Sequence, residues 1–330
     1  MSLLPWLHQR LPKVWMSRGP VAIALSPLAS IYGALMAVRR LSYSLGILPT
    51  KRLPALVVVV GNVVAGGAGK TPMTIALVKY LMAKGLSVGV VSRGHGRLTR
   101  DVRAVQADSL PQDVGDEPLL ILHSTGAPVW VGALRAQAGE QLLQAHPQVQ
   151  VIVCDDGLQH LALARDIEIC VMDDRGIGNG WILPAGPLRE AWPRSVDLLV
   201  HSGRSPVTGG FQAPRQLAEH AVTQNGQQIP LLNLKAQEID AVAGLARPEA
   251  FFQMLRQSGL QLGATLALPD HHDYSHWQAM NTGRVLLCTE KDAAKLWAHE
   301  PEALAVPLHM TPEPAFWAAL NALLQKHGLA

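Results

Sequence analysis

The segment "GGAGKTP" brings four small residues, a lysine and a hydroxyl group into one short stretch. Backbone N–H groups of such a glycine-rich loop can surround phosphate oxygens, because glycine tolerates the required dihedral angles. Lys70 would reach the β- and γ-phosphates, and the Thr71 hydroxyl would ligate Mg²⁺. The predicted nucleotide-binding residues are Gly66, Gly67, Ala68, Gly69, Lys70, Thr71 and Pro72. The usual spacing G-x-x-x-x-G-K-T would need glycine at position 64, where this chain has Val64.

A pair of acids ends another apolar run. "VQVIVCDD" closes with Asp155 and Asp156. Parallel α/β sheets bind their ligands at the carboxyl ends of strands, so one of these aspartates is predicted to hold Mg²⁺ directly or through water. The alternative is an acidic turn that is solvated or caps a helix.

The elements that must position these groups alternate between strand and helix from about residue 54 to residue 200. "ALVVVVGN" is a continuous apolar run, as expected for a parallel strand covered on both faces. A helix is predicted from about 70 to 84, directly after the glycine-rich loop, with Gly85 at its end. Further strands are predicted at 87–92, 127–132, 149–156 and 167–174. Strands joined by helices in this way predict an open parallel sheet.

The predicted fold class is therefore α/β, with a phosphate-loop NTPase-like parallel sheet domain and a smaller α/β domain at the C-terminal end. Asn225-Gly226 lies between two alternating runs and predicts a β-hairpin that connects the two domains. We expect an apolar and basic segment at 1–40, which is part of the first domain. The phosphate-loop domain would span 41–215, the hairpin connector 216–238 and the smaller domain 239–330.

Charge is unevenly distributed along the chain. Residues 1–100 contain 13 of the 28 lysines and arginines and no aspartate or glutamate. An anionic partner is therefore expected at this end, either nucleic acid or an anionic membrane surface. Residues 21–38 are free of charge and are flanked by basic residues, which favours a helix in the membrane interface over a spanning helix or a core helix. The three cysteines are far apart, so neither a disulfide framework nor a zinc site is expected.

Several peptides together resemble the tetraacyldisaccharide 4′-kinases of lipid A biosynthesis, in that family's order over nearly the whole chain. They are "GNVVAGGAGKTP", "SRGHGR", "DVGDEP", "DDGLQH", "LPAGPLRE", "AGLARPEAFF", "PDHHDYS" and "TEKDAAKL". The family's loop ordinarily lacks the first glycine, so Val64 agrees with the resemblance. His95 and Leu158 depart mildly, since tyrosine and phenylalanine are common at these positions.

The resemblance implies that the chain phosphorylates the 4′-hydroxyl of a membrane-embedded, acylated glucosamine disaccharide 1-phosphate, with ATP and Mg²⁺, to form lipid IVA. It also implies a peripheral location on the cytoplasmic face of the inner membrane, with residues 1–40 against an anionic bilayer. A nucleic-acid partner is not expected.

The resemblance further implies roles for single residues. Asp116 would accept the proton of the hydroxyl together with His271, and Glu117 would support the metal or the same network. His272 is the alternative to His271. Arg189 would clamp phosphates, with Arg93 as a weaker candidate. Gln159 and His160 would lie beside the phosphates, with the acids Asp155 and Asp156.

A different class of function remains open, namely a membrane-associated nucleotide-switch ATPase or GTPase. Switch ATPases of the partitioning type carry a signature lysine where this chain has Ala65. The sequence also lacks metal-binding Cys/His clusters and a plain N-K-x-D peptide, of which "TEKDAAKL" is the nearest approach. These features count against the switch.

Overall fold

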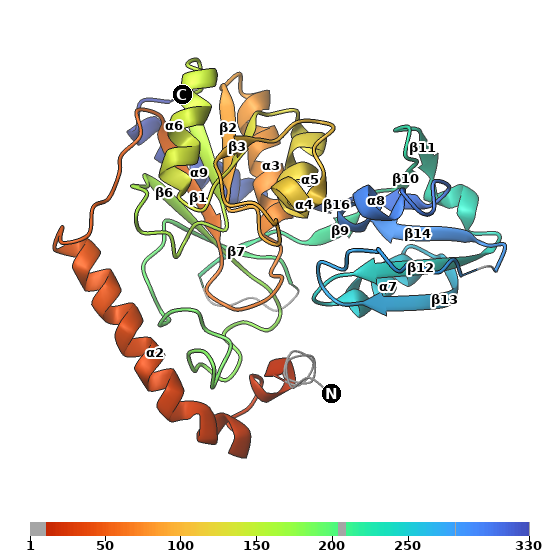
Figure 1. The fold of residues 1–330 in the computed structure, drawn as a ribbon, viewed down its shortest axis with the longest axis horizontal. Coiled ribbons are helices and arrows are strands. Elements are labelled where there is room, and N and C mark those ends of the chain that lie inside the picture. Colours follow the sequence, from red (N-terminus) through yellow and green to blue (C-terminus); the bar gives the residue numbers. More distant parts are fainter. Residues whose placement is uncertain (1–10, 204–208, 281, 330) are drawn as a thin grey trace.

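The computed structural model describes residues 11–203, 209–280 and 282–329 of the 330-residue chain. Within them, two sheets with their covering helices form a larger and a smaller unit (Figure 1). The long helix α2 (Pro20–Ser44) runs beside the larger unit, on the side away from the smaller one (Figure 1). Residues 1–10 of the predicted membrane segment lie outside the described residues.

The larger sheet has eight strands in the order β3-β4-β2-β5-β1-β6-β7-β8. All neighbours pair in parallel except β3 and β4, as the alternation of strands and helices predicts. Its strands are β1 (Leu56–Gly61), β2 (Val88–Ser92), β3 (Arg103–Ala104), β4 (Val129–Val131), β5 (Val151–Asp155), β6 (Ile167–Met172), β7 (Leu198–His201) and β8 (Phe211–Gln212).

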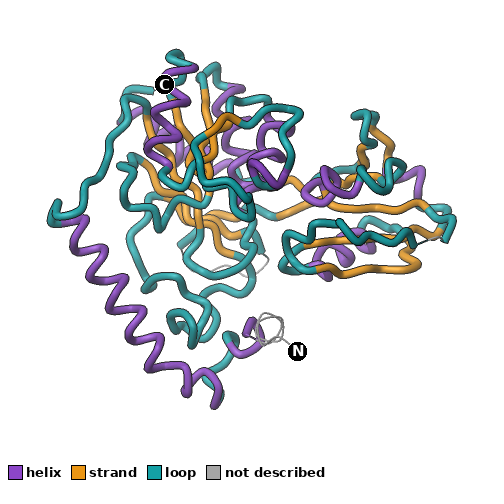
Figure 2. The backbone as a smooth tube through the Cα atoms, viewed as in Figure 1, coloured by secondary structure: helices purple, strands orange, loops and turns teal. Residues whose placement is uncertain are grey.

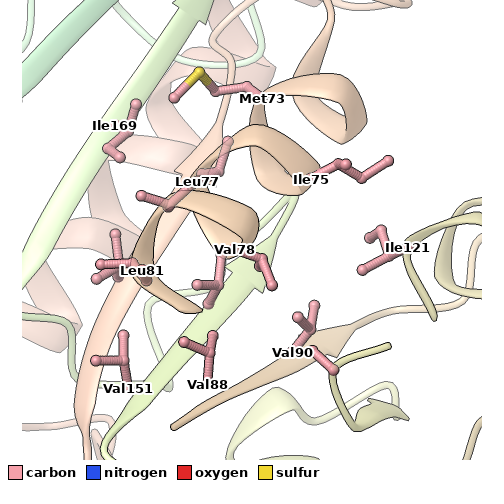
Figure 3. Packing of buried hydrophobic residues seen from close by; sticks show 14 of the residues in the cluster. Met73, Ile75, Leu77, Val78, Leu81, Val88, Val90, Ile121, Val151 and Ile169 are labelled. Atoms are coloured by element: carbon pink, nitrogen blue, oxygen red, sulfur yellow. The ribbon is translucent and has the colours of Figure 1, made fainter. Parts of the chain in front are cut away.

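Helices cover both faces of this sheet. Successive valines of β1 point to opposite faces, so Val58 and Val60 belong to one core and Val57 and Val59 to the other. The first core contains side chains of α3 (Lys70–Ala83), α5 (Asp116–Thr125) and α9 (Pro314–Lys326), and the second those of α6 (Arg135–Ala145). Figure 3 shows side chains of α3 directed toward the strand residues of the first core. The short helix α4 (Pro111–Val114) precedes α5.

The smaller unit is built on a six-stranded sheet in the order β11-β10-β15-β14-β12-β13. Two hydrophobic clusters surround it, one with side chains of α7 (Pro248–Gln257) and the other with side chains of α8 (Glu290–Leu296). Its other elements are β10 (His220–Val222), β11 (Gln228–Pro230), η1 (Leu231–Leu234), β12 (Glu238–Gly244), β13 (Gln261–Leu268), β14 (Val285–Thr289) and β15 (Leu304–Val306).

The predicted domain boundaries need two corrections. The hairpin around Asn225-Gly226 is present, but β10 also pairs with β15, so the hairpin extends the smaller sheet and is no separate connector. The closing helix α9 buries Phe316, Leu320 and Leu324 in a core of the larger sheet, so it does not belong to the smaller unit. The two units are joined by a ribbon of β9 (Arg215–Leu217) and β16 (Leu308–Met310), which Figure 2 shows crossing between them.

Helix α2 exposes most of its apolar surface, which includes Ile31, Leu35 and Val38. Among the described residues it is the one helix long and apolar enough to cross a membrane by length and composition. Pro27 lies inside it. Its polar contacts with the larger unit involve Tyr32, Arg39 and Arg40, whose partners lie in the loop between β5 and β6 and in the loop between β6 and β7.

Candidate active site

The glycine-rich loop follows β1 and ends where α3 begins at Lys70. Gly66 (φ 90°) and Gly69 (φ 94°) adopt left-handed backbone conformations that side-chain-bearing residues rarely reach. Gly69 is the N-cap of α3, so the unpaired N–H groups of the first helical turn face the loop. Thr71 and Pro72 lie in this first turn and are half-buried. This is the geometry of an anion-binding loop at a helix N-terminus.

The packing of Val64 shows why the loop has no glycine at this position. The side chain is 1% exposed within the second core of the larger sheet, and the residue forms a bridge with Leu188. Asn62 Nδ2 donates to the carbonyl oxygen of Val64 (2.7 Å), and Ala65 N donates to Pro187 O (2.8 Å). Val64 has no positive φ, so its position needs packing and not conformational freedom.

Lys70 and Arg189 converge on Asp156. Lys70 Nζ is 3.8 Å from Asp156 Oδ1, and Arg189 Nη1 donates to Oδ1 at 3.0 Å and to Oδ2 at 3.2 Å. Burial alone would raise the pKa of Asp156, but the charges of Lys70 and Arg189 hold it below its usual value. The predicted clamp and the predicted acid therefore meet beside the phosphate loop.

Asp155 is the more deeply buried member of the acid pair, at 1% exposed. Thr74 Oγ1, one turn into α3, donates to its Oδ1 at 2.8 Å. Burial, and then the negative charges of Glu117 and Asp156, raise the pKa of Asp155 to about 7. Acids that oppose one another's ionisation suit a bound cation, and carboxylate and hydroxyl oxygens are donors that Mg²⁺ prefers. Within the described part of the chain, no three His, Cys, Asp or Glu side chains form a ready-made metal cluster.

Asp116 and His271 meet across the two units. His271 Nδ1 is 3.1 Å from Asp116 Oδ2, and Asp116 is the first residue of α5. His271 has a φ of 60°, which is uncommon outside glycine and turns the residue out of the regular backbone path. Burial would raise the pKa of Asp116, but the hydrogen bond with His271 and the charge of Lys295 lower it overall. The structure pairs His271 with Asp116, and their catalytic roles remain predictions.

Two lysines of α8 complete this cluster. Lys295 Nζ donates to Asp116 Oδ2 at 2.9 Å, on the same oxygen as His271. Lys291 Nζ lies 2.8 Å from Asp270 Oδ1, 3.3 Å from His271 Nε2 and 3.7 Å from Glu117 Oε1. Glu117 thus joins the network through Lys291.

The other predicted site residues differ in their contacts. Gln159 Nε2 donates to Glu190 Oε1 (2.7 Å), and its Oε1 lies 3.4 Å from Arg189 Nη1. Burial and neighbouring arginines lower the pKa of His160 to about 4, so this side chain is neutral. His272 Nδ1 accepts a hydrogen bond from Tyr274 N within its own turn. Arg93 is exposed on the loop after β2.

Comparisons with known proteins give the family of the chain. The family model described as "Tetraacyldisaccharide-1-P 4'-kinase" matches residues 21–325. The chain is 54% identical over 321 residues to the tetraacyldisaccharide 4′-kinase of Acidovorax sp. (strain JS42), covering 96% of this chain and 95% of that one. It is 53% identical to the protein of that name from Polaromonas naphthalenivorans (strain CJ2), with the same coverage. The chain belongs to this kinase family.

A solved structure supports the fold as well. LpxK from Aquifex aeolicus, an "apo" form in complex with ATP, has a TM-score of 0.80 and 28% identity, covering 93% of this chain and 99% of that one. The mixed α/β fold with a parallel sheet is thereby confirmed. The protein is a phosphotransferase of lipid A biosynthesis that acts on an alcohol group.

Sequence reasoning missed the two lysines of this kinase, Lys291 and Lys295. Both stand in the peptide "TEKDAAKL", which contributed only to the resemblance. A signal was present, because residues i and i+4 share one face of a helix. What the sequence could not supply was the packing of α8 against α5, which depends on how the two units meet.

His95 also acquires a place in the site. Its ring centroid lies 5.1 Å from that of His271, with the rings tilted by 59°. Burial, followed by the charge of His271, lowers the pKa of His95. His95, which stands where tyrosine is common in the family, therefore lies beside the predicted catalytic pair.

Proposed function

We propose that this kinase transfers the γ-phosphate of ATP, with Mg²⁺, to the 4′-hydroxyl of tetraacyldisaccharide 1-phosphate and so forms lipid IVA. The observation that carries the proposal is the Asp116–His271 pair, which joins the two units beside Glu117, whose charge acts on Asp155. A nucleotide switch needs no such group, whereas transfer to a hydroxyl needs an acceptor for its proton.

Asp116 is suited to accept that proton through its second oxygen. His271 and Lys295 both contact Oδ2, and among the described residues no hydrogen bond reaches Oδ1. The lowered pKa of Asp116 makes it ionised at neutral pH but only a weak base. A weak base suffices, because the transition state of phosphoryl transfer is loose and the proton leaves late. His271 orients the carboxylate and can share the proton.

Lys70 and Arg189 would neutralise charge that develops on the transferred phosphoryl group. Both form ion pairs with Asp156 in this structure, and a triphosphate would offer them a more strongly charged anionic partner. Their side chains are partly buried, so their attraction to phosphate is less screened than at the surface.

Thr71, Asp155 and Asp156 would hold Mg²⁺, directly or through water. A cation held there would supply positive charge that neutralises the phosphate groups. Asp155 fits this task because Glu117 and Asp156 oppose its ionisation, and a cation between them would relieve that repulsion.

The glycolipid would approach along α2, on the cytoplasmic face of the inner membrane. Arg39 donates to Gln159 O (3.2 Å), and Arg40 contacts Glu190 at 2.8 Å, so the apolar helix borders the loop that carries Arg189. A small pocket lies here, lined by Met36, Arg39, Arg40, Leu158, Gln159, Leu161, Arg189 and Glu190. Apolar surface beside basic groups suits an anionic lipid and an anionic bilayer.

A turnover assay tests the proposal. Purified protein, Mg-ATP and detergent-dispersed disaccharide 1-phosphate should yield lipid that has gained one phosphate. Asp116→Asn should lose most of this activity and still bind ATP. The control Asp113→Asn, three residues upstream, should keep both the activity and the binding of ATP. Hydrolysis of ATP with the lipid unmodified would favour the switch and refute the kinase.

A further inference from the structure

Three arginines gather beside the phosphate loop, at the carboxyl ends of β6 and β7. Arg175 follows β6, Arg215 is the first residue of β9, and Arg247 precedes α7. Arg175 is fully engaged within the larger unit. Its Nε donates to both oxygens of Asp173 (3.0 Å each), and its Nη atoms donate to Ala65 O (3.0 Å) and Gly67 O (3.2 Å).

Arg247 brings the smaller unit to the same place. Its Nη1 lies 3.3 Å from Asp173 Oδ2, while its side chain remains 43% exposed. The preceding residue, Ala246, lies against the loop, since a Cβ placed on Gly67 would be 3.8 Å from Ala246 Cβ. This contact between the units is separate from the Asp116–His271 pair.

Arg215 has no strong partner. Its side chain lies against the loop, since a Cβ placed on Gly69 would be 3.5 Å from Arg215 Cδ. Within the part of the chain that the structure describes, its guanidinium makes no hydrogen bond and no ion pair within 4.0 Å. Burial lowers its pKa although the charges of Asp173 and Asp174 raise it, which expresses the cost of holding this half-buried cation partly away from water. An anion at this position would offset that cost.

We propose that Arg215 and Arg247 bind the phosphates of the nucleotide from the side of the smaller unit. The proposal rests on the nucleotide binding proposed above. A guanidinium binds phosphate oxygens bidentately, and both arginines border the loop that takes the phosphates. Arg247 belongs to the smaller unit and Arg215 to the ribbon that joins the units. Bound nucleotide therefore holds the smaller unit on the loop and keeps His271 on Asp116.

Binding of a fluorescent ATP analogue to the full-length protein, without glycolipid, tests the proposal. Arg215→Ala and Arg247→Ala should each weaken binding at least about tenfold. Inorganic tripolyphosphate, which has no base or ribose, should displace the analogue from the wild type and lose a similar factor in both variants. The matched control is Arg256→Ala, because Arg256 is exposed on the last turn of α7.

Arg215→Lys and Arg247→Lys give a second reading, in case an alanine variant does not fold. They keep the charge and lose the bidentate geometry, so a smaller loss of affinity is expected in protein with the wild-type melting temperature. The proposal would be overturned if folded variants bound both probes with affinities within a factor of about two of the wild-type values. So would a loss for the ATP analogue without a loss for tripolyphosphate, or failure of tripolyphosphate to displace the analogue from the wild type. Wild type that binds ATP but leaves the glycolipid unmodified would refute the proposed kinase reaction alone.

Discussion

At the scale of single residues, Lys295 distinguishes Asp116 from an isolated buried carboxylate. Its ammonium group lies 2.9 Å from Asp116 Oδ2 and helps to lower the pKa of that acid. Lys295→Met removes the cation, so the pKa of Asp116 should rise. Since only ionised Asp116 can accept the proton in the proposed mechanism, the acid limb of the kcat/KM profile should move to higher pH. Lys295→Arg should leave the limb near its wild-type position. An unmoved limb in Lys295→Met would show that Lys295 does not act on Asp116.

Asp155 differs from Asp116 in that its pKa is raised and not lowered, which gives a second prediction. Its pKa is raised to about 7, so the folded protein keeps this acid protonated at lower pH and bears the cost of a buried charge at higher pH. Mg²⁺ should therefore raise the melting temperature more at pH 8 than at pH 6. In Asp155→Asn this pH dependence should disappear, whereas in Asp113→Asn it should persist. An equal Mg²⁺ effect at both pH values in the wild type would count against Asp155 as a ligand.

At the scale of elements, α9 shows what the pattern of residues could not reveal. Its apolar spacing predicts a helix, but the choice between two sheets depends on where β16 returns the chain. Leu320, which is fully buried, should stabilise the larger unit. Leu320→Ala should cost about 2–5 kcal/mol in the free energy of unfolding. Hydrogen exchange should report faster opening in β7 and β8 and not in β12 and β14. Faster exchange in β12 and β14, and not in β7 and β8, would show that α9 stabilises the smaller unit instead.

Helix α2 carries the proposed contact with the bilayer. Ile31, Leu35 and Val38 lie on one face and are each about 60% exposed. Replacing all three by serine should strongly reduce flotation of the protein with liposomes that contain anionic lipids. The control replaces three exposed leucines outside α2, namely Leu98, Leu134 and Leu232, and should float normally. Equal flotation of both variants would argue against α2 as the main anchor.

Much of the larger unit could be predicted from its sequence, because buried parallel strands read as short apolar runs. The loop, Asp155 and Asp156 could be located from the ends of such runs. Contacts between distant peptides could not, since no local signal shows that "TEKDAAKL" faces "DVGDEP" or that Arg247 reaches Asp173. Resemblance to the family supplied the pair of Asp116 and His271, and the structure supplied the lysines around it.

At the scale of the whole molecule, the site is complete only when the two units meet. The larger unit contributes the loop and Asp116, and the smaller unit contributes His271 and both lysines. Closure of one unit on the other would assemble these groups and exclude water from ATP. If catalysis depends on this arrangement, removing either residue of a cross-unit contact should lower the rate about as much as removing both.

A double-mutant cycle on kcat for phosphate transfer to the disaccharide lipid tests this claim most directly. Asp116→Ala and His271→Ala should each lower kcat by ~10²–10⁴-fold, with ATP binding retained. The double variant should be no more than about threefold slower than the slower single variant, because the two residues act as a unit. Near-normal turnover in either single variant, or losses that multiply in the double variant, would contradict a proton acceptor built across the two units.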